Sequence, residues 1–114
     1  MKTHRFLLLF LIAMLPMALS AHAPKKISLK YDRDAGKLSI SIVHPVKDAE
    51  DHFIDEIVIS VNGEEVEKLE YKTQSSLKKH EVEIDLPDLK TGDQLRVKTF
   101  CNKFGSKTGK LEIN

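Results

Sequence analysis

The chain of 114 residues contains one cysteine, Cys101, so an internal disulfide is excluded. A small domain without a disulfide depends for its stability on its core, on a bound metal or on a partner. The lone thiol is therefore a buried side chain, an intermolecular bridge or a metal ligand.

The sequence also lacks the motifs of several function classes. It has no phosphate-binding loop, no nucleophile elbow and no pair of catalytic carboxylates. Basic and acidic residues are interspersed, the formal net charge is +1, and there is no long block of one sign. We therefore expect no nucleic acid as a partner.

One apolar run, residues 6–15, follows a positively charged start and precedes a group of small residues. This order is typical of a secretory signal peptide. The run is shorter than the roughly 20 residues that a bilayer requires, and no second run follows it. We predict a signal peptide over 1–20, cut after Ser20, and a single mature domain over 21–114. That domain is expected to be periplasmic or secreted and to leave the membrane once the signal is removed.

The mature part is dominated by short runs in which apolar and polar residues alternate, the pattern of half-buried strands. Turn signals at 32–36 and at Asn62-Gly63 separate neighbouring runs. A change of parity between Val66 and Leu69 predicts a β-bulge. No run has a convincing helical period. The predicted strands lie at 27–31, 38–42, 54–61, 66–71, 82–86, 95–99 and 111–113. The sequence thus predicts an all-β, immunoglobulin-like antiparallel sandwich of about seven strands.

Three potential metal ligands stand at the ends of these predicted strands. His44 and His52 lie on the same loop, and Cys101 has the parity of the core face of the preceding run. Imidazole and thiolate are common ligands of transition metals. Because the loops of a sandwich cluster at its two ends, the three side chains meet if their strand ends share one end. The alternative is a buried cysteine that packs as a small apolar residue beside two solvated histidines.

The motifs around these residues resemble the iron domain of superoxide reductases, the desulfoferrodoxin and neelaredoxin family. They are His44-Pro45, an acidic loop that ends in His52-Phe53-Ile54, and Cys101-Asn102 followed by Gly105. His22-Ala23-Pro24 matches the N-terminal His-x-Pro element of that family. The resemblance implies a seven-strand immunoglobulin-like sandwich that binds mononuclear iron and reduces superoxide to hydrogen peroxide. It also implies a small redox protein as electron donor.

Carried onto this chain, the resemblance assigns three imidazoles and one thiolate to the metal. The implied ligands are His22, His44, His52 and Cys101. Phe104 stands where the family has a fourth histidine, so one ligand of the family pattern is missing. Glu56 replaces a family tryptophan, and the lysine that precedes the first histidine in the family is absent.

Two other functions remain open at this stage. A copper carrier results if signal cleavage exposes His22 as an N-terminal chelating residue. A metal-free immunoglobulin-like module results if Phe104 packs under the last loop and the histidines are structural. His80 shares the parity of Val82, and we expect it at a strand edge rather than in the metal site. No residue is assigned a certain catalytic role.

Overall fold

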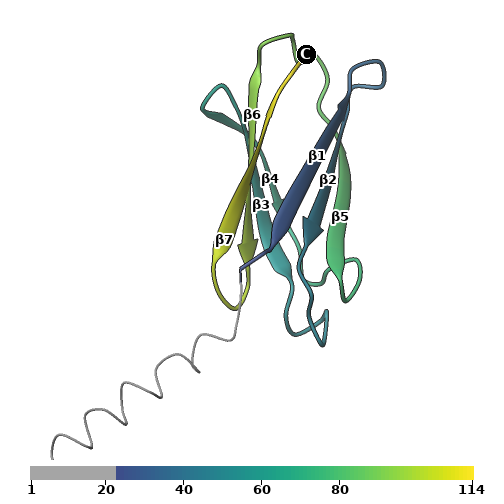
Figure 1. Ribbon diagram of the computed structural model, residues 1–114, viewed down its shortest axis with the longest axis vertical. Coiled ribbons are helices and arrows are strands. Elements are labelled where there is room, and N and C mark those ends of the chain that lie inside the picture. The colour runs from purple at the N-terminus through teal and green to yellow at the C-terminus, as the bar shows by residue number, and fades with distance from the viewer. Residues whose placement is uncertain (1–22) are drawn as a thin grey trace, which may run out of the picture.

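The computed structural model describes residues 23–114; the predicted signal peptide and His22 lie outside the described residues. Seven antiparallel strands form two sheets, in the orders β1-β2-β5 and β4-β3-β6-β7 (Figure 1). The strands are β1 (Lys26–Asp32), β2 (Lys37–Val43), β3 (Ile54–Val61), β4 (Glu64–Glu70), β5 (Lys79–Asp85), β6 (Gln94–Cys101) and β7 (Ser106–Glu112). The predicted immunoglobulin-like sandwich is confirmed. In residues 23–114 no helix is long and apolar enough to cross a membrane.

The core lies between the two sheets and is built from the alternating residues of the central strands. Every second residue of β2 is buried, and β3 and β6 bury their apolar positions against it. Burial of a large aliphatic side chain stabilises a fold by about 1.5–3 kcal/mol. The fully buried cluster comprises Leu38, Ile40, Ile42, Ile54, Ile57, Ile59, Leu95 and Val97.

The predicted turn and bulge are both present. Asn62 and Gly63 have φ of 52° and 85°, the left-handed conformation that a two-residue hairpin requires. The pairing of β3 with β4 passes from Glu67 to Glu65, which leaves Val66 as the extra residue of a bulge. The bulge therefore explains the change of parity in the sequence.

Two strands begin three or more residues earlier than the apolar pattern indicated. β5 starts at Lys79 and β7 at Ser106, whereas the pattern placed their starts at residues 82 and 111. Both are edge strands, and the early residues of each are mostly exposed. An edge strand can make its backbone hydrogen bonds to the neighbouring strand without burying a full face of side chains. Alternating apolar residues therefore appear along only part of such a strand.

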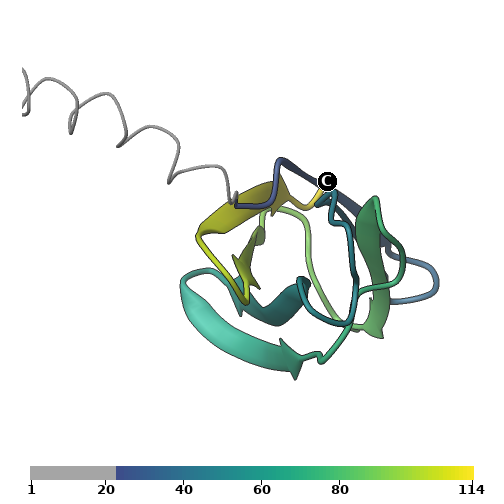
Figure 2. The ribbon, with the colours of Figure 1, turned by 90° about the horizontal axis from the view of Figure 1, so that it is seen from below.

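One end of the sandwich gathers three loops that carry, adjoin or contact the candidate ligand residues, and we call it the site end. These loops are 44–53 between β2 and β3, 71–78 between β4 and β5, and 102–105 between β6 and β7. Figure 1 shows this end at the bottom, and Figure 2 looks onto it. The first described residue, Ala23, also lies there, because a Cβ built on Gly105 would be 2.7 Å from the Ala23 Cβ. The C-terminus lies at the opposite end (Figure 1).

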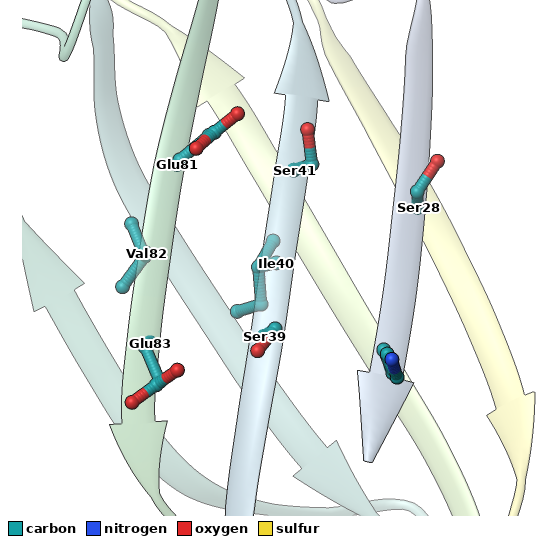
Figure 3. A pocket seen from close by; sticks show the side chains of 8 residues that line it. Ser28, Ser39, Ile40, Ser41, Glu81, Val82 and Glu83 are labelled. Carbon is teal, nitrogen blue, oxygen red and sulfur yellow. The ribbon is translucent and has the colours of Figure 1, made fainter. Parts of the chain in front are cut away.

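The outer face of the β1-β2-β5 sheet is polar and shallowly hollowed. Serine and glutamate side chains cover it along the three strands (Figure 3). Its lining comprises Ser28, Lys30, Ser39, Ile40, Ser41, Glu81, Val82 and Glu83, with no histidine or cysteine among these described residues. The hollow therefore offers no imidazole or thiolate for a metal.

Candidate metal centre

Strand pairing places Cys101 next to the end of loop 44–53. Cys101 is the last residue of β6 and pairs with Ile54, the first residue of β3. Asn102 fixes the chain just before Ile54: its backbone N–H donates to the Phe53 carbonyl (3.0 Å), and its side-chain oxygen accepts the Phe53 N–H (2.9 Å). As a result His52 Nε2 lies 3.0 Å from Cys101 Sγ.

His44 reaches the same point from the other sheet. It follows β2 directly and continues the inward parity of Ile42, so its side chain is only 1% exposed. Its ring meets that of His52 edge to face, with centroids 4.8 Å apart and an interplanar angle of 87°. The loop 44–53 thus carries two imidazoles to the sulfur of Cys101.

The protonation of His44 follows from its contact with Gln74, a residue of loop 71–78 that is 4% exposed. The Gln74 side-chain nitrogen donates to the carbonyls of His44 (2.8 Å) and Ser76 (2.9 Å). Carbonyls only accept, so the amide oxygen must be the atom that faces His44 Nδ1 at 2.9 Å. In the neutral ring Nδ1 therefore carries the proton, and Nε2 holds the lone pair.

That lone pair is buried. Within the described part of the chain, His44 Nε2 has no hydrogen-bond partner. A buried acceptor without a partner carries a desolvation cost of about 1–3 kcal/mol, which a metal ion or a donor at this point would remove. In the neutral form of the ring this nitrogen holds the lone pair, and neutral imidazole is the form that binds metals.

The three ligand atoms lie close enough to share one ion. One atom each from His44, His52 and Cys101 lies within 4.8 Å of the others. With metal–nitrogen bonds of about 2.0–2.1 Å and metal–sulfur bonds of about 2.3 Å, two ligands at a right angle are about 3.1 Å apart and two opposite ligands about 4.4 Å apart. The observed 3.0 Å between His52 Nε2 and Cys101 Sγ fits adjacent ligands. The three side chains could therefore hold one metal ion between them.

The loop after β6 encloses the sulfur. Cys101 is 8% exposed, and its Sγ accepts a hydrogen bond from the Lys103 backbone N–H at 3.4 Å. The Cys101 N–H in turn donates to the Gly105 carbonyl (3.0 Å), and the φ of Gly105 is 80°, a conformation that favours glycine. An ion pair between Lys103 Nζ and Asp51 (3.3 Å) joins this loop to the His52 loop.

Two other candidates behave differently. His22 lies outside the described residues. Phe104 is 55% exposed, so it does not pack under the last loop as the metal-free alternative supposed, and a phenyl ring offers no ligand atom. The described part of the chain therefore contributes two imidazoles and one thiolate.

His80 lies on an edge strand, β5, as expected. Its side chain nevertheless faces inward and is buried. It is 5% exposed, and its ring meets that of Tyr71 edge to face at 4.4 Å. Its Nδ1 accepts the backbone N–H of Ser75 at 3.1 Å, so in the neutral ring the proton is on Nε2 and no lone pair remains for a metal. Burial, together with the charge of His44, lowers the pKa of His80.

Sequence reasoning missed Gln74. The segment around it reads as a polar loop of serine, threonine and lysine, and a single glutamine there has no periodic neighbour to mark it. Its role appears only when the pairing of β2 with β5 sets loop 71–78 beside His44. The contact between the buried Gln74 and the candidate ligand His44 arises from the tertiary structure, so no local sequence pattern marks it.

No family model matches the chain, and no curated protein matches it in sequence. Solved structures share its fold. A superoxide reductase (1Fe-SOR) from Giardia intestinalis matches 81% of this chain and 100% of its own length with a TM-score of 0.60 and 17% identity. A superoxide reductase (neelaredoxin) from Ignicoccus hospitalis covers 85% of each chain with a TM-score of 0.53 and 16% identity. A hypothetical protein from Pyrococcus horikoshii covers 82% of this chain and 90% of its own, with a TM-score of 0.52 and 15% identity.

These likenesses define the class of the fold. The chain is an antiparallel sandwich with the fold of superoxide reductases, which confirms at the level of the fold the resemblance seen in the motifs. At the site end it carries a His/His/Cys cluster that can bind a metal.

Proposed function

We propose that this chain is an exported iron protein that reduces superoxide to hydrogen peroxide at a mononuclear site formed by His44, His52 and Cys101. The observation that carries the proposal is the buried His44 Nε2 lone pair beside a His52–Cys101 contact of 3.0 Å. The fold supports iron over other metals, because two of the structures that share it are named superoxide reductases. His22 is the proposed fourth ligand.

The proposed chemistry divides between the metal and the chain. Bound ferrous iron would supply one electron to superoxide, which takes up two protons and leaves as hydrogen peroxide. His44 and His52 would hold the metal through their imidazole nitrogens, and the Cys101 sulfur would be its electron-rich ligand. The Lys103 N–H keeps that sulfur oriented.

Exposed lysines at the site end support an anionic substrate. Lys103 and Lys107 flank the cysteine loop; Lys103 pairs with Asp51, whereas no ion pair holds Lys107 within the described residues, so Lys107 is the charge available to an anion. Positive charge near a site raises the rate at which small anions arrive. Turnover requires that the metal be reduced again, and we propose a small redox protein as donor.

The first test is metal content. We expect about one iron per chain after anaerobic loading of the mature protein. On oxidation we expect a sulfur-to-iron charge-transfer band that Cys101→Ser removes while the circular dichroism of the fold stays unchanged. Failure of the wild type to retain iron would contradict the proposal. Retention of copper in place of iron, dependent on an N-terminal His22, would support the carrier function instead.

The second test is the stoichiometry of the reaction. A reductase supplied with a reductant yields one peroxide for each superoxide, whereas dismutation yields one peroxide for every two. We expect the reductase ratio from the iron-loaded protein and no superoxide consumption above background from Cys101→Ser. N-terminal sequencing of the exported protein tests the predicted cut after Ser20.

A further inference from the structure

We propose that Gln74 is a positioning residue of the metal site, which fixes the tautomer of His44 so that the Nε2 lone pair faces the metal. The inference rests on the proposed function in one respect, namely that a metal binds at His44, His52 and Cys101. It adds a residue from a loop that contributes no ligand of its own.

A 180° flip of the Gln74 side-chain amide would break hydrogen bonds. Its nitrogen donates to two carbonyls and its oxygen accepts from His44 Nδ1, so every hydrogen on the nitrogen is used. A rotated amide would place its oxygen against the carbonyls of His44 and Ser76. That would break two buried hydrogen bonds, each worth about 1 kcal/mol, and leave buried groups unsatisfied at a further cost. The observed orientation is therefore fixed.

The loop that carries Gln74 is itself held against the loop of His44. The Thr73 hydroxyl donates to the Ala49 carbonyl at 3.0 Å, and the Val46 N–H donates to the Leu77 carbonyl at 2.7 Å. These bonds lie on either side of Gln74 along its loop. They anchor the amide to the chain segment that it orients.

A fixed amide dictates the state of the imidazole. An unconstrained neutral histidine exchanges its proton between Nδ1 and Nε2, and the second form has no lone pair at the metal. With the Gln74 oxygen at 2.9 Å, the proton stays on Nδ1 and the ring is also prevented from turning. An acceptor on the far nitrogen raises the basicity of a metal-bound imidazole, and loss of such a partner typically lowers metal affinity by about 10–100-fold.

A pair of variants separates positioning from loop structure. Gln74→Met and Gln74→Glu both lose the two N–H donors to the carbonyls, but the carboxylate keeps an acceptor for His44 Nδ1. Cobalt(II) binding, measured by visible absorption against a competing chelator, is the probe. We expect Gln74→Met to bind about 10–100-fold more weakly than wild type and Gln74→Glu to restore binding. Lys72→Gln, an exposed change in the same loop that also lowers the charge by one, controls for the added negative charge and should not strengthen binding.

The carboxylate of Gln74→Glu also places an oxygen against the carbonyls of His44 and Ser76, so thermal unfolding of both variants must first show that each is folded. Equal binding by the two folded variants would overturn the inference, because only the glutamate keeps an acceptor for His44 Nδ1. A rise in affinity in Lys72→Gln equal to the difference between them would overturn it as well, since charge alone would then explain the rescue.

A second measurement needs no variant and no metal. In metal-free wild-type protein labelled with ¹⁵N at histidine, two-bond nitrogen–proton correlations report which ring nitrogen carries the proton. We expect Nδ1–H for His44 and, as an internal reference, Nε2–H for His80. An Nε2–H tautomer at His44 overturns the inference even if the variants do not fold. If the wild type binds no metal, the proposed function fails and the tautomer result still judges the Gln74 contact.

Discussion

The two buried histidines at the site end, His44 and His80, differ in what holds them. Both are almost inaccessible to water, and Nε2 of each has no hydrogen-bond partner within the described residues. A side-chain amide accepts from Nδ1 of His44, whereas a backbone N–H donates to Nδ1 of His80. The same kind of residue is therefore left with a lone pair in one place and with an N–H in the other. Burial and an unsatisfied nitrogen do not identify a metal ligand until the partner of the second nitrogen is known.

The largest expected effect is on metal affinity. Replacement of His44 by alanine removes a ligand, so we expect cobalt(II) or iron(II) affinity to fall by more than the roughly 10–100-fold typical of outer partners. His80→Gln should leave the affinity unchanged, because the His80 Nε2 holds a proton. Competition titrations on both variants test this, with thermal unfolding to show that each is folded. Equal losses in the two variants would break the contrast between the histidines.

The next effect is on the pH dependence of stability. The pKa of His80 is lowered in the folded protein, first by burial and then by the charge of His44, from an unfolded value of about 6.5. Between the two pKa values the unfolded chain binds more protons, so the free energy of unfolding falls as the pH drops below about 6.5. Urea titrations of the metal-free protein at several pH values measure this slope.

His80→Gln should make that slope shallower, because the glutamine does not titrate. An unchanged slope in this variant would show that the pH dependence comes from other groups.

The smallest effect concerns the residue that fixes His80. Ser75→Ala removes a hydroxyl that lies 3.1 Å from His80 Nδ1 and accepts the Glu81 N–H at 2.7 Å, but it keeps the Ser75 backbone N–H. We expect a loss of about 1 kcal/mol in the free energy of unfolding. The Nε2–H tautomer of His80 should persist, because the backbone donor remains. A change of tautomer in the nitrogen spectrum would show that the hydroxyl, rather than the backbone, sets it.

The sandwich was predictable from the sequence because its central strands alternate cleanly. Residues 38–42 and 95–99 show the period of the core face, and Asn62-Gly63 marks a hairpin by its chemistry alone. The proximity of His44, His52 and Cys101 was predictable only as a possibility, because it depends on which strand ends lie at the same end of the sandwich.

What the sequence did not reveal depends on contacts between distant segments. Gln74 is 30 residues from His44 along the chain, and neither residue carries a local sign of the other. The burial of His80 was missed because the lysines before it suggested an exposed edge. The metal-free alternative supposed that Phe104 packs under the last loop, but its side chain is exposed on the short loop between β6 and β7.

The hairpins at 32–36 and 62–63 lie at the end of the sandwich opposite to the site end (Figure 1). Peptide tags or fluorophore attachment points grafted into either turn would extend away from the ligands by the full length of the sandwich. Immobilisation through either turn would therefore leave the site end, with its candidate metal ligands, facing solution.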